Sequence, residues 1–248
     1  MVDFDSAVGR SGLVEGARAA QRFYIRQLSV HQSERIPAGS FLALSNHPGI
    51  TDTLSLFCAL ARPDLKIIAL QRPFLEALPY VAKQLFYVDD DPAKRLGVVR
   101  RVSSHLRAGG AALTFPAGKI EPDPNVSAGA IESLSGWTDS AGVFIRLAPD
   151  TPILPVLVRG VVWSAAAKHP LLRIKSAGEE RERLAAALQL LVQVLLSIKP
   201  VHVRVQIGNP VNSRELGTTN IHNLHEAVIH QMSRLINNPP DEPGQFLL

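Results

Sequence analysis

Short apolar runs with strand character alternate along the chain with longer segments of helical period. The pattern predicts strands near residues 41–45, 66–70, 86–88, 111–115, 152–162 and 201–207, and helices near residues 50–61, after Pro73, 92–107 and 179–198. Such alternation is typical of an α/β layer fold. We therefore expect a single layered domain over residues 1–236, with a mostly parallel central sheet flanked by helices, and an irregular tail over residues 237–248.

One predicted helix has an unusual pattern. Residues 179–198 begin with charged side chains and continue as a long apolar stretch that is broken by Gln189 and Gln193. A helix that is apolar nearly all round is usually buried, so we expect this one to belong to the core. The alternative is a helix that lies in a membrane interface.

Composition and charge narrow the class of protein. Of 248 residues, 46% are hydrophobic and 19% are charged, which favours a folded globular chain. The one cysteine, Cys58, excludes an intramolecular disulfide and a cysteine-clustered zinc site, and it suits the cytoplasm. No apolar run is long enough to span a bilayer, and charged residues throughout positions 1–30 argue against a signal peptide.

The net charge of +4 is compatible with an anionic membrane, a phosphorylated substrate or nucleic acid. We do not expect nucleic acid as a partner, because the chain has neither a basic cluster interleaved with aromatic residues nor a zinc finger. Nor do we expect a metal site, because His225 and His230 are five residues apart and do not share a helical face. The acidic run at residues 89–91 is interpreted as a solvated helix start rather than a cation site.

The clearest chemical feature is the segment Asn-His-Pro-Gly-Ile-Thr-Asp at residues 46–52, at a predicted strand-to-helix turn. Active sites of parallel α/β proteins gather at such strand ends. Asp52 in the first helical turn can accept a hydrogen bond from His47 and fix its tautomer, which leaves the other ring nitrogen free to take a proton from a substrate. Asn46 and Gly49 are turn formers that support this arrangement.

A second turn leaves another predicted strand, with the sequence Thr-Phe-Pro-Ala-Gly-Lys-Ile-Glu at residues 114–121. Gly118 lets the backbone approach a ligand and Lys119 offers a positive charge, so a phosphate site is one interpretation and an ordinary surface turn is the other. A nucleotide P-loop is excluded, because Ile120 follows the lysine in place of serine or threonine. No Gly-x-Ser-x-Gly elbow is present, and Cys58 falls within an apolar helix, so a serine or cysteine hydrolase is not expected.

Four segments, SNHPGITDTLSL, ALQRPFLEALPY, GAALTFPAGKIEPDP and TPILPVLVRGV, resemble in order and spacing the four motifs of the glycerolipid (lysophosphatidic acid) acyltransferase family, over about residues 41–161. The resemblance implies that His47 is a general base and Asp52 its orienter. It also implies that the final apolar strand, with Pro155, packs beneath an acceptor loop formed by Phe115, Pro116, Ala117, Gly118 and Lys119.

Two departures concern the acceptor. The family usually has glutamate where this chain has Ala117, and arginine after its second motif where this chain has the acidic run 89–91. Those family residues are held to grip glycerol phosphate, so Arg72 and Glu121 are the candidates to replace them in acceptor binding. The Pro-Ala-Gly version is also similar to branches that acylate other lipids, including ornithine lipids.

The expected activity is direct transfer of a fatty acyl group from an acyl thioester to a lysophospholipid or other glycerolipid, with backbone donors stabilising the oxyanion. Acyl-CoA and acyl carrier protein both remain open as the donor, and no bound cofactor is expected. We expect a cytoplasmic enzyme attached peripherally to the inner face of a membrane. The alternatives are a lipid-binding protein with this fold but no catalysis, a hydrolase that uses His47 with water, and an N-acyltransferase of ornithine-type lipids.

Overall fold

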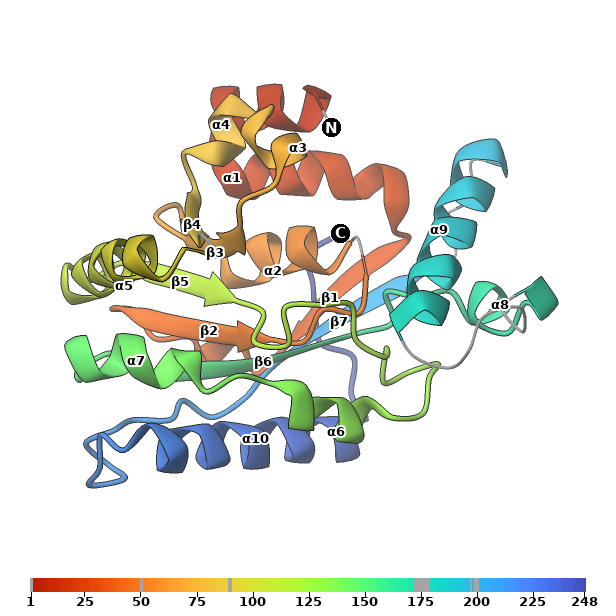
Figure 1. Cartoon of the computed structure of the whole chain (residues 1–248). Coiled ribbons are helices and arrows are strands. Elements are labelled where there is room, and N and C mark those ends of the chain that lie inside the picture. Colours follow the sequence, from red (N-terminus) through yellow and green to blue (C-terminus); the bar gives the residue numbers. More distant parts are fainter. Residues whose placement is uncertain (1, 50, 89–90, 172–178, 197, 199–200) are drawn as a thin grey trace.

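A central sheet organises the molecule, which was analysed as a computed structural model describing residues 2–49, 51–88, 91–171, 179–196, 198 and 201–248 (Figure 1). Within these ranges the sheet has eight strands in the order β4-β3-β5-β2-β6-β7-β1-β8. Their bounds are β1 (Gln27–His31), β2 (Phe41–Ser45), β3 (Lys66–Leu70), β4 (Leu85–Val88), β5 (Ala111–Thr114), β6 (Ile153–Arg159), β7 (His202–Ile207) and β8 (Gln245–Phe246).

Most of the sheet is parallel. Strands β4, β3, β5, β2 and β6 run in one direction, so their carboxyl ends share one edge. Strand β7 is antiparallel to β6, β1 is parallel to β7, and β8 is antiparallel to β1. The predicted α/β fold with a mostly parallel sheet is confirmed.

Helices cover both faces of the sheet, because alternate strand residues point to opposite sides (Figure 1). On one face, α1 (Val2–Tyr24) and α2 (Asp52–Leu60) pack on Phe41, Ala43 and Val156. On the other, α5 (Pro92–Arg107), α7 (Ser140–Leu147) and α10 (Ile221–Asn237) pack on Leu42, Leu44 and Leu157. Shorter helical turns complete the chain: η1 (Ser33–Arg35), α3 (Pro73–Glu76), α4 (Pro79–Ala82), α6 (Ala130–Ser133), η2 (Leu134–Gly136) and α8 (Ser164–Ala167).

The helix expected in the core, α9 (Glu179–Leu196), lies at the surface, so that prediction was wrong. Gln189 and Gln193 are buried, while Leu191 is 55% and Leu195 71% exposed. The two glutamines are satisfied by main-chain groups, which allows the polar side of the helix to face inward. The segment 237–248 also differs from expectation, because its residues 245–246 form β8.

Candidate active site

The turn that follows β2 lies between two other strand ends. In the sheet register Leu44 pairs with Thr114 of β5, and Ser45 pairs with Val156 of β6. The chain leaves β2 at Ser45 and enters α2 at Asp52, with the loop after β5 on one side and the end of β6 on the other. The register therefore brings the first, third and fourth sequence motifs to one edge of the sheet.

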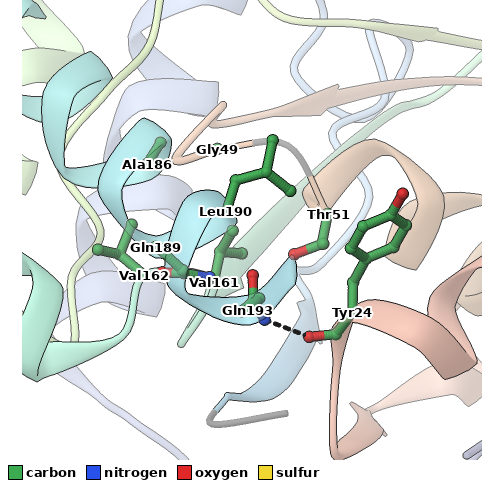
Figure 2. Close-up of a pocket in the computed structure, with 9 residues that line it drawn as sticks. All are labelled: Tyr24, Gly49, Thr51, Val161, Val162, Ala186, Gln189, Leu190 and Gln193. Carbon is green, nitrogen blue, oxygen red and sulfur yellow. Dashed lines mark hydrogen bonds between the residues drawn. The ribbon is translucent and has the colours of Figure 1, made fainter. Parts of the chain in front are cut away.

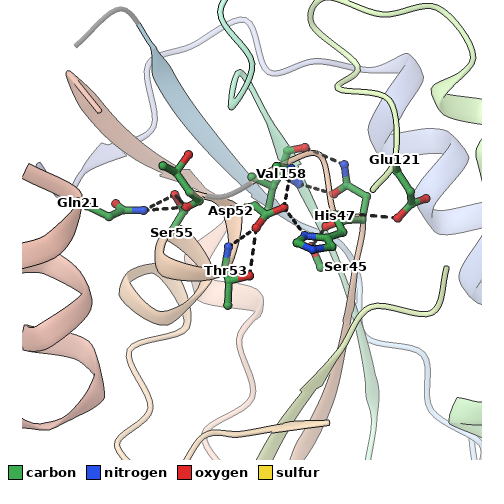
Figure 3. Close-up of polar contacts among 11 residues, drawn as sticks. Gln21, Ser45, His47, Asp52, Thr53, Ser55, Glu121 and Val158 are labelled. Atoms are coloured by element: carbon green, nitrogen blue, oxygen red, sulfur yellow. Dashed lines mark hydrogen bonds and ion pairs between the residues drawn. The ribbon is translucent and has the colours of Figure 1, made fainter. Parts of the chain in front are cut away.

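His47 and Asp52 form a hydrogen-bonded pair in this turn (Figure 3). The Nδ1 atom of His47 lies 2.7 Å from Oδ2 of Asp52. An ionised carboxylate only accepts hydrogen bonds, so Nδ1 carries the proton in the neutral ring and Nε2 is the basic nitrogen. The His47 side chain is 28% exposed and the Asp52 side chain is fully buried, so the ring can meet a substrate while its orienter cannot.

Asp52 is held by donors from its own turn. The Gly49 N–H donates to Oδ2 at 3.0 Å, and Thr53 donates to Oδ1 through its N–H and, at 3.1 Å, its hydroxyl. Asp52 is the first residue of α2, where the aligned peptide dipoles favour a negative charge. The carboxylate is thus fixed in position before any substrate arrives.

Glu121 lies behind the histidine and not at the exposed edge where acceptor binding was expected. It is 1% exposed; its Oε2 accepts from the His47 N–H at 3.0 Å and its Oε1 from the Trp137 indole N–H at 2.7 Å. The Glu121 N–H in turn donates to the His47 carbonyl at 2.9 Å. Both carboxylate oxygens are engaged within the protein, so Glu121 serves the histidine and does not face an acceptor.

Two carboxylates set the charge state of His47. Burial acts to lower the pKa of His47, but the charge and hydrogen bond of Asp52 and the charge of Glu121 outweigh it, and the pKa rises above 6.5. Burial also raises the pKa of Glu121, opposed in part by its hydrogen bonds from Trp137, His47 and Ser133. A histidine with a raised pKa is a stronger base once it is neutral.

The loop after β5 covers the imidazole. The Phe115 ring stacks on His47, with centroids 4.6 Å apart and planes at 29°. Pro116 is buried, Ala117 is half-buried, and Gly118 and Lys119 are exposed at the tip of the turn. Gly118 has φ 64°, in the left-handed region that glycine adopts without strain.

Asn46 and Gly49 support the site in different ways. The Asn46 side chain donates to the Val158 carbonyl at 2.9 Å and accepts from the Val158 N–H at 2.8 Å, which ties the turn to β6. A Cβ on Gly49 would lie 2.9 Å from Val161, so the turn packs closely there. Pro155 lies within β6, where it pairs with Leu44 of β2 in the sheet register.

Arg72 follows the end of β3 as the residue before α3, and it is exposed. Strands β3, β5 and β2 are neighbours and parallel, so Arg72, Lys119 and His47 all leave the same sheet edge. In Figure 1 the chain after β3 rises to α3 beside α1 and α4, and the loop after β5 runs past the end of β2. Two exposed cations therefore share the edge that carries the base.

Two buried residues of the site region were not singled out from the sequence. Gln21 of α1 donates to the Thr51 carbonyl at 3.0 Å and to the Ser55 hydroxyl at 2.6 Å, which ties α1 to the start of α2. Asp123 accepts from the N–H groups of Gly160 and Val162, both at 2.9 Å, and so ties the loop after β5 to the end of β6. Asp123 lies within the third of the four quoted segments and Gln21 lies outside all of them, but only tertiary contacts reveal what either residue does.

Cys58 is buried in α2, and burial raises the pKa of its thiol to about 12. A thiol in that state is not a nucleophile. The groups available for chemistry are therefore an oriented imidazole base, an aromatic cover and nearby exposed cations. This set can remove a proton from a hydroxyl or amine that is brought to the carboxyl edge of the sheet.

Comparison with known proteins agrees with this geometry. The chain matches the family described as Acyltransferase over residues 27–159, more than half of its length. Among solved structures, the fold is similar to the crystal structure of the 1-acyl-sn-glycerophosphate (LPA) acyltransferase, PlsC, from Thermotoga maritima, with a TM-score of 0.53 and 17% identity over 94% of this chain and 84% of that one. No curated protein sequence matches. The match over residues 27–159 includes both residues of the His47–Asp52 pair, and the chain belongs to the acyltransferase family.

Proposed function

We propose that this acyltransferase moves a fatty acyl group from an acyl thioester to a glycerolipid acceptor such as a lysophospholipid. Nε2 of His47 removes the proton from the acceptor hydroxyl, and the oxygen attacks the thioester carbonyl. The carbon–sulfur bond then breaks and the thiol leaves with the proton returned by His47. Asp52 orients the ring and stabilises the imidazolium between these two proton transfers.

The observation that carries this proposal is the 2.7 Å bond between Nδ1 of His47 and the buried carboxylate of Asp52. It leaves Nε2, which has no hydrogen-bond partner among the described residues, as the basic nitrogen. No covalent acyl-enzyme is required, because the described site places no serine or cysteine against the imidazole. The donor is acyl-CoA or acyl carrier protein, and the protein needs no cofactor of its own.

We place acceptor binding at the loop after β5, where Lys119 is exposed. The second exposed cation, Arg72, follows β3 on the same edge of the sheet. Ala117 offers no charge there, so we propose that an acceptor phosphate is held by these two cations. The similar Thermotoga maritima structure is that of a 1-acyl-sn-glycerophosphate (LPA) acyltransferase, which supports an acceptor of this class. An amino-acid lipid of the ornithine type is the second acceptor class, favoured by the absence of an acidic side chain at position 117.

The enzyme works at a membrane surface, because its acceptor is a lipid. Across the described residues, no helix is both long and apolar enough to cross a bilayer. A chain with a net charge of +4 is attracted to the anionic cytoplasmic leaflet.

The test is mass spectrometry of the products formed by purified protein. The protein is given acyl-CoA or acyl carrier protein thioester with a panel of acceptors that includes lysophosphatidic acid, lysophosphatidylcholine, glycerol phosphate and lyso-ornithine lipid. We expect one acylated lipid product that depends on both substrates. Free fatty acid released in the absence of any acceptor would identify a hydrolase, and vesicle binding without any product would identify a lipid-binding protein.

A further inference from the structure

Helix α9 turns its polar side toward the protein. Ala185, Gln189 and Gln193 recur every four residues and are buried. Gln189 accepts from the Trp163 N–H at 2.6 Å and donates to the Val161 carbonyl at 3.0 Å, while Gln193 donates to the Tyr24 carbonyl at 2.6 Å (Figure 2). These bonds fix the rotation of the helix about its axis.

The opposite side of α9 carries a stripe of leucines. Leu184, Leu188, Leu191 and Leu195 have spacings of four, three and four residues, which places them on one face. Leu184 is half-buried and packs against the cluster of Val162 and Ala185, Leu188 is half-buried, and Leu191 and Leu195 are 55% and 71% exposed. A helix on a water-facing surface normally has the reverse arrangement, with leucines inward and glutamines outward.

The end of α1, which Gln193 ties to α9, carries an exposed aromatic side chain and positive charge. The bond from Gln193 to Tyr24 holds the last turn of α1 against α9. Phe23 in that turn is 76% exposed, and Arg22 and Arg26 on either side of it are exposed as well. An exposed aromatic side chain flanked by arginines is typical of segments that meet lipid headgroups.

The inner side of α9 leads to the catalytic turn. Leu190 and Gln193 line a pocket whose opposite wall includes Gly49 and Thr51, the residues between His47 and Asp52 in the chain (Figure 2). The helix therefore has the leucine stripe on one side and a pocket that borders the catalytic turn on the other.

We propose that the leucine stripe of α9 and the Phe23 end of α1 form the surface that docks on an anionic lipid bilayer. This inference rests on the proposed function, because a lipid acceptor is what makes a bilayer the partner. Arg22 and Arg26 complement anionic headgroups, and the apolar side chains enter the boundary between headgroups and acyl chains. Docking in this way places the pocket beside Gly49 on the far side of α9 from the bilayer, one helix diameter (roughly 10 Å) from the membrane surface.

A second copy of the chain fits this face less well. Stable dimers bury roughly 800 Å² on each partner, and leucine stripes that form coiled coils extend over at least about three heptads. The stripe on α9 covers the twelve residues 184–195. Positive side chains at its edge would also face their own copies across a twofold axis.

The test compares two double variants of the full chain by sedimentation with vesicles of phosphatidylcholine and phosphatidylglycerol. Leu191→Ser/Leu195→Ser removes the two most exposed leucines of the stripe, and the control is Leu147→Ser/Leu216→Ser, at leucines of α7 and of the turn before α10 that are 43% and 45% exposed. We expect about tenfold weaker vesicle binding for the first variant and wild-type binding for the control, with unchanged thermal melting for both. Arg22→Gln/Arg26→Gln should lose binding that depends on phosphatidylglycerol and on low salt.

Wild-type binding by Leu191→Ser/Leu195→Ser would overturn the docking surface. So would a wild-type dimer that this variant converts to monomers in sedimentation velocity, since the face would then belong to a second copy. Acyl transfer to an acceptor dispersed in detergent separates the two proposals, because it should survive in all three variants. A wild type that binds vesicles through α9 but transfers no acyl group would contradict the proposed function and leave the docking surface standing.

Discussion

His47 and Glu121 are joined by two hydrogen bonds in opposite directions. The main-chain N–H of His47 donates to the side-chain carboxylate of Glu121 at 3.0 Å, and the main-chain N–H of Glu121 donates to the carbonyl of His47 at 2.9 Å. The contact joins the turn after β2 to the loop after β5, two segments that are 74 residues apart in the chain. The position of His47 therefore depends on the same loop that carries Phe115 and Lys119. This contact therefore helps to fix the positions of both His47 and the loop after β5.

Replacement of the base is the first test. His47→Ala should lower acyl transfer by roughly 10²- to 10⁴-fold, because the general base is lost. The melting temperature should change little, since the side chain is partly exposed and lies in a loop. His222→Ala, at an exposed position on α10, is the control and should keep full activity. Activity above about a tenth of wild type in His47→Ala would mean that another group is the base.

Removal of the orienting charge is the second test. Asp52→Asn retains the shape of the side chain but loses the charge that stabilises the imidazolium and can hold the ring in the wrong tautomer. We expect kcat to fall by at least about 10²-fold with a smaller change in KM. If the double variant His47→Ala/Asp52→Asn is far less active than either single variant, the two residues do not act as one unit.

The pH dependence tests Glu121. The charge of Glu121 helps to raise the pKa of His47, so Glu121→Gln should lower that pKa. Activity requires neutral His47 and rises with pH through its pKa; in the variant this rise should therefore move to lower pH. A merely structural role for Glu121 would reduce activity equally at every pH.

The free energy of unfolding gives an independent test of the role of Glu121. Glutamine has one carbonyl oxygen for the two donors His47 N–H and Trp137 N–H, so Glu121→Gln should also lower the free energy of unfolding by about 1 to 3 kcal/mol. Glu132→Gln, which changes an exposed carboxylate on α6, is the matched control. Denaturant titration at neutral pH measures both variants.

Acceptor recognition is tested at the exposed cations. If Lys119 and Arg72 hold an acceptor phosphate, either alanine substitution should cost roughly 1.5 to 3 kcal/mol in transition-state binding, measured as a fall in kcat/KM. Lys168→Ala, at an exposed position near α8, should change nothing. An amino-acid lipid as acceptor should make Lys119→Ala cost well under tenfold. Efficient use of lysophosphatidic acid by both variants would show that other residues hold the phosphate.

Local patterns in the sequence predicted much of this architecture. The strands β2, β3, β5 and β7 and the basic helix α5 appear within a residue or two of the expected bounds, because their periods are regular and turn residues bound them. The pairing of His47 with Asp52 was expected from their spacing at a predicted strand-to-helix turn, and the structure places the two side chains in contact. Strand β1 was not predicted, since Gln27–His31 mixes polar and apolar residues over only five positions.

Two errors share a physical cause. Glu121 was expected at the acceptor and α9 in the core, and each assignment depended on which way a side chain faces. Hydrophobicity along the chain does not reveal that Gln189 and Gln193 find main-chain partners at Trp163, Val161 and Tyr24. Nor does it show that the Trp137 indole N–H and the His47 main-chain N–H both donate to the buried carboxylate of Glu121. Long-range partners decide such orientations.

The short strand β8 closes one side of the sheet. Gln245 and Phe246 pair with Val30 and Ser29 of β1, and the Leu247 N–H donates to the Leu28 carbonyl at 2.9 Å. Residues 245–248 thereby occupy main-chain groups of β1 on that side. An open strand edge is a template for association with other molecules. Deletion of residues 245–248 should therefore expose the edge of β1 and promote aggregation through strand pairing. Preparations that aggregate can be checked first for loss of these four residues.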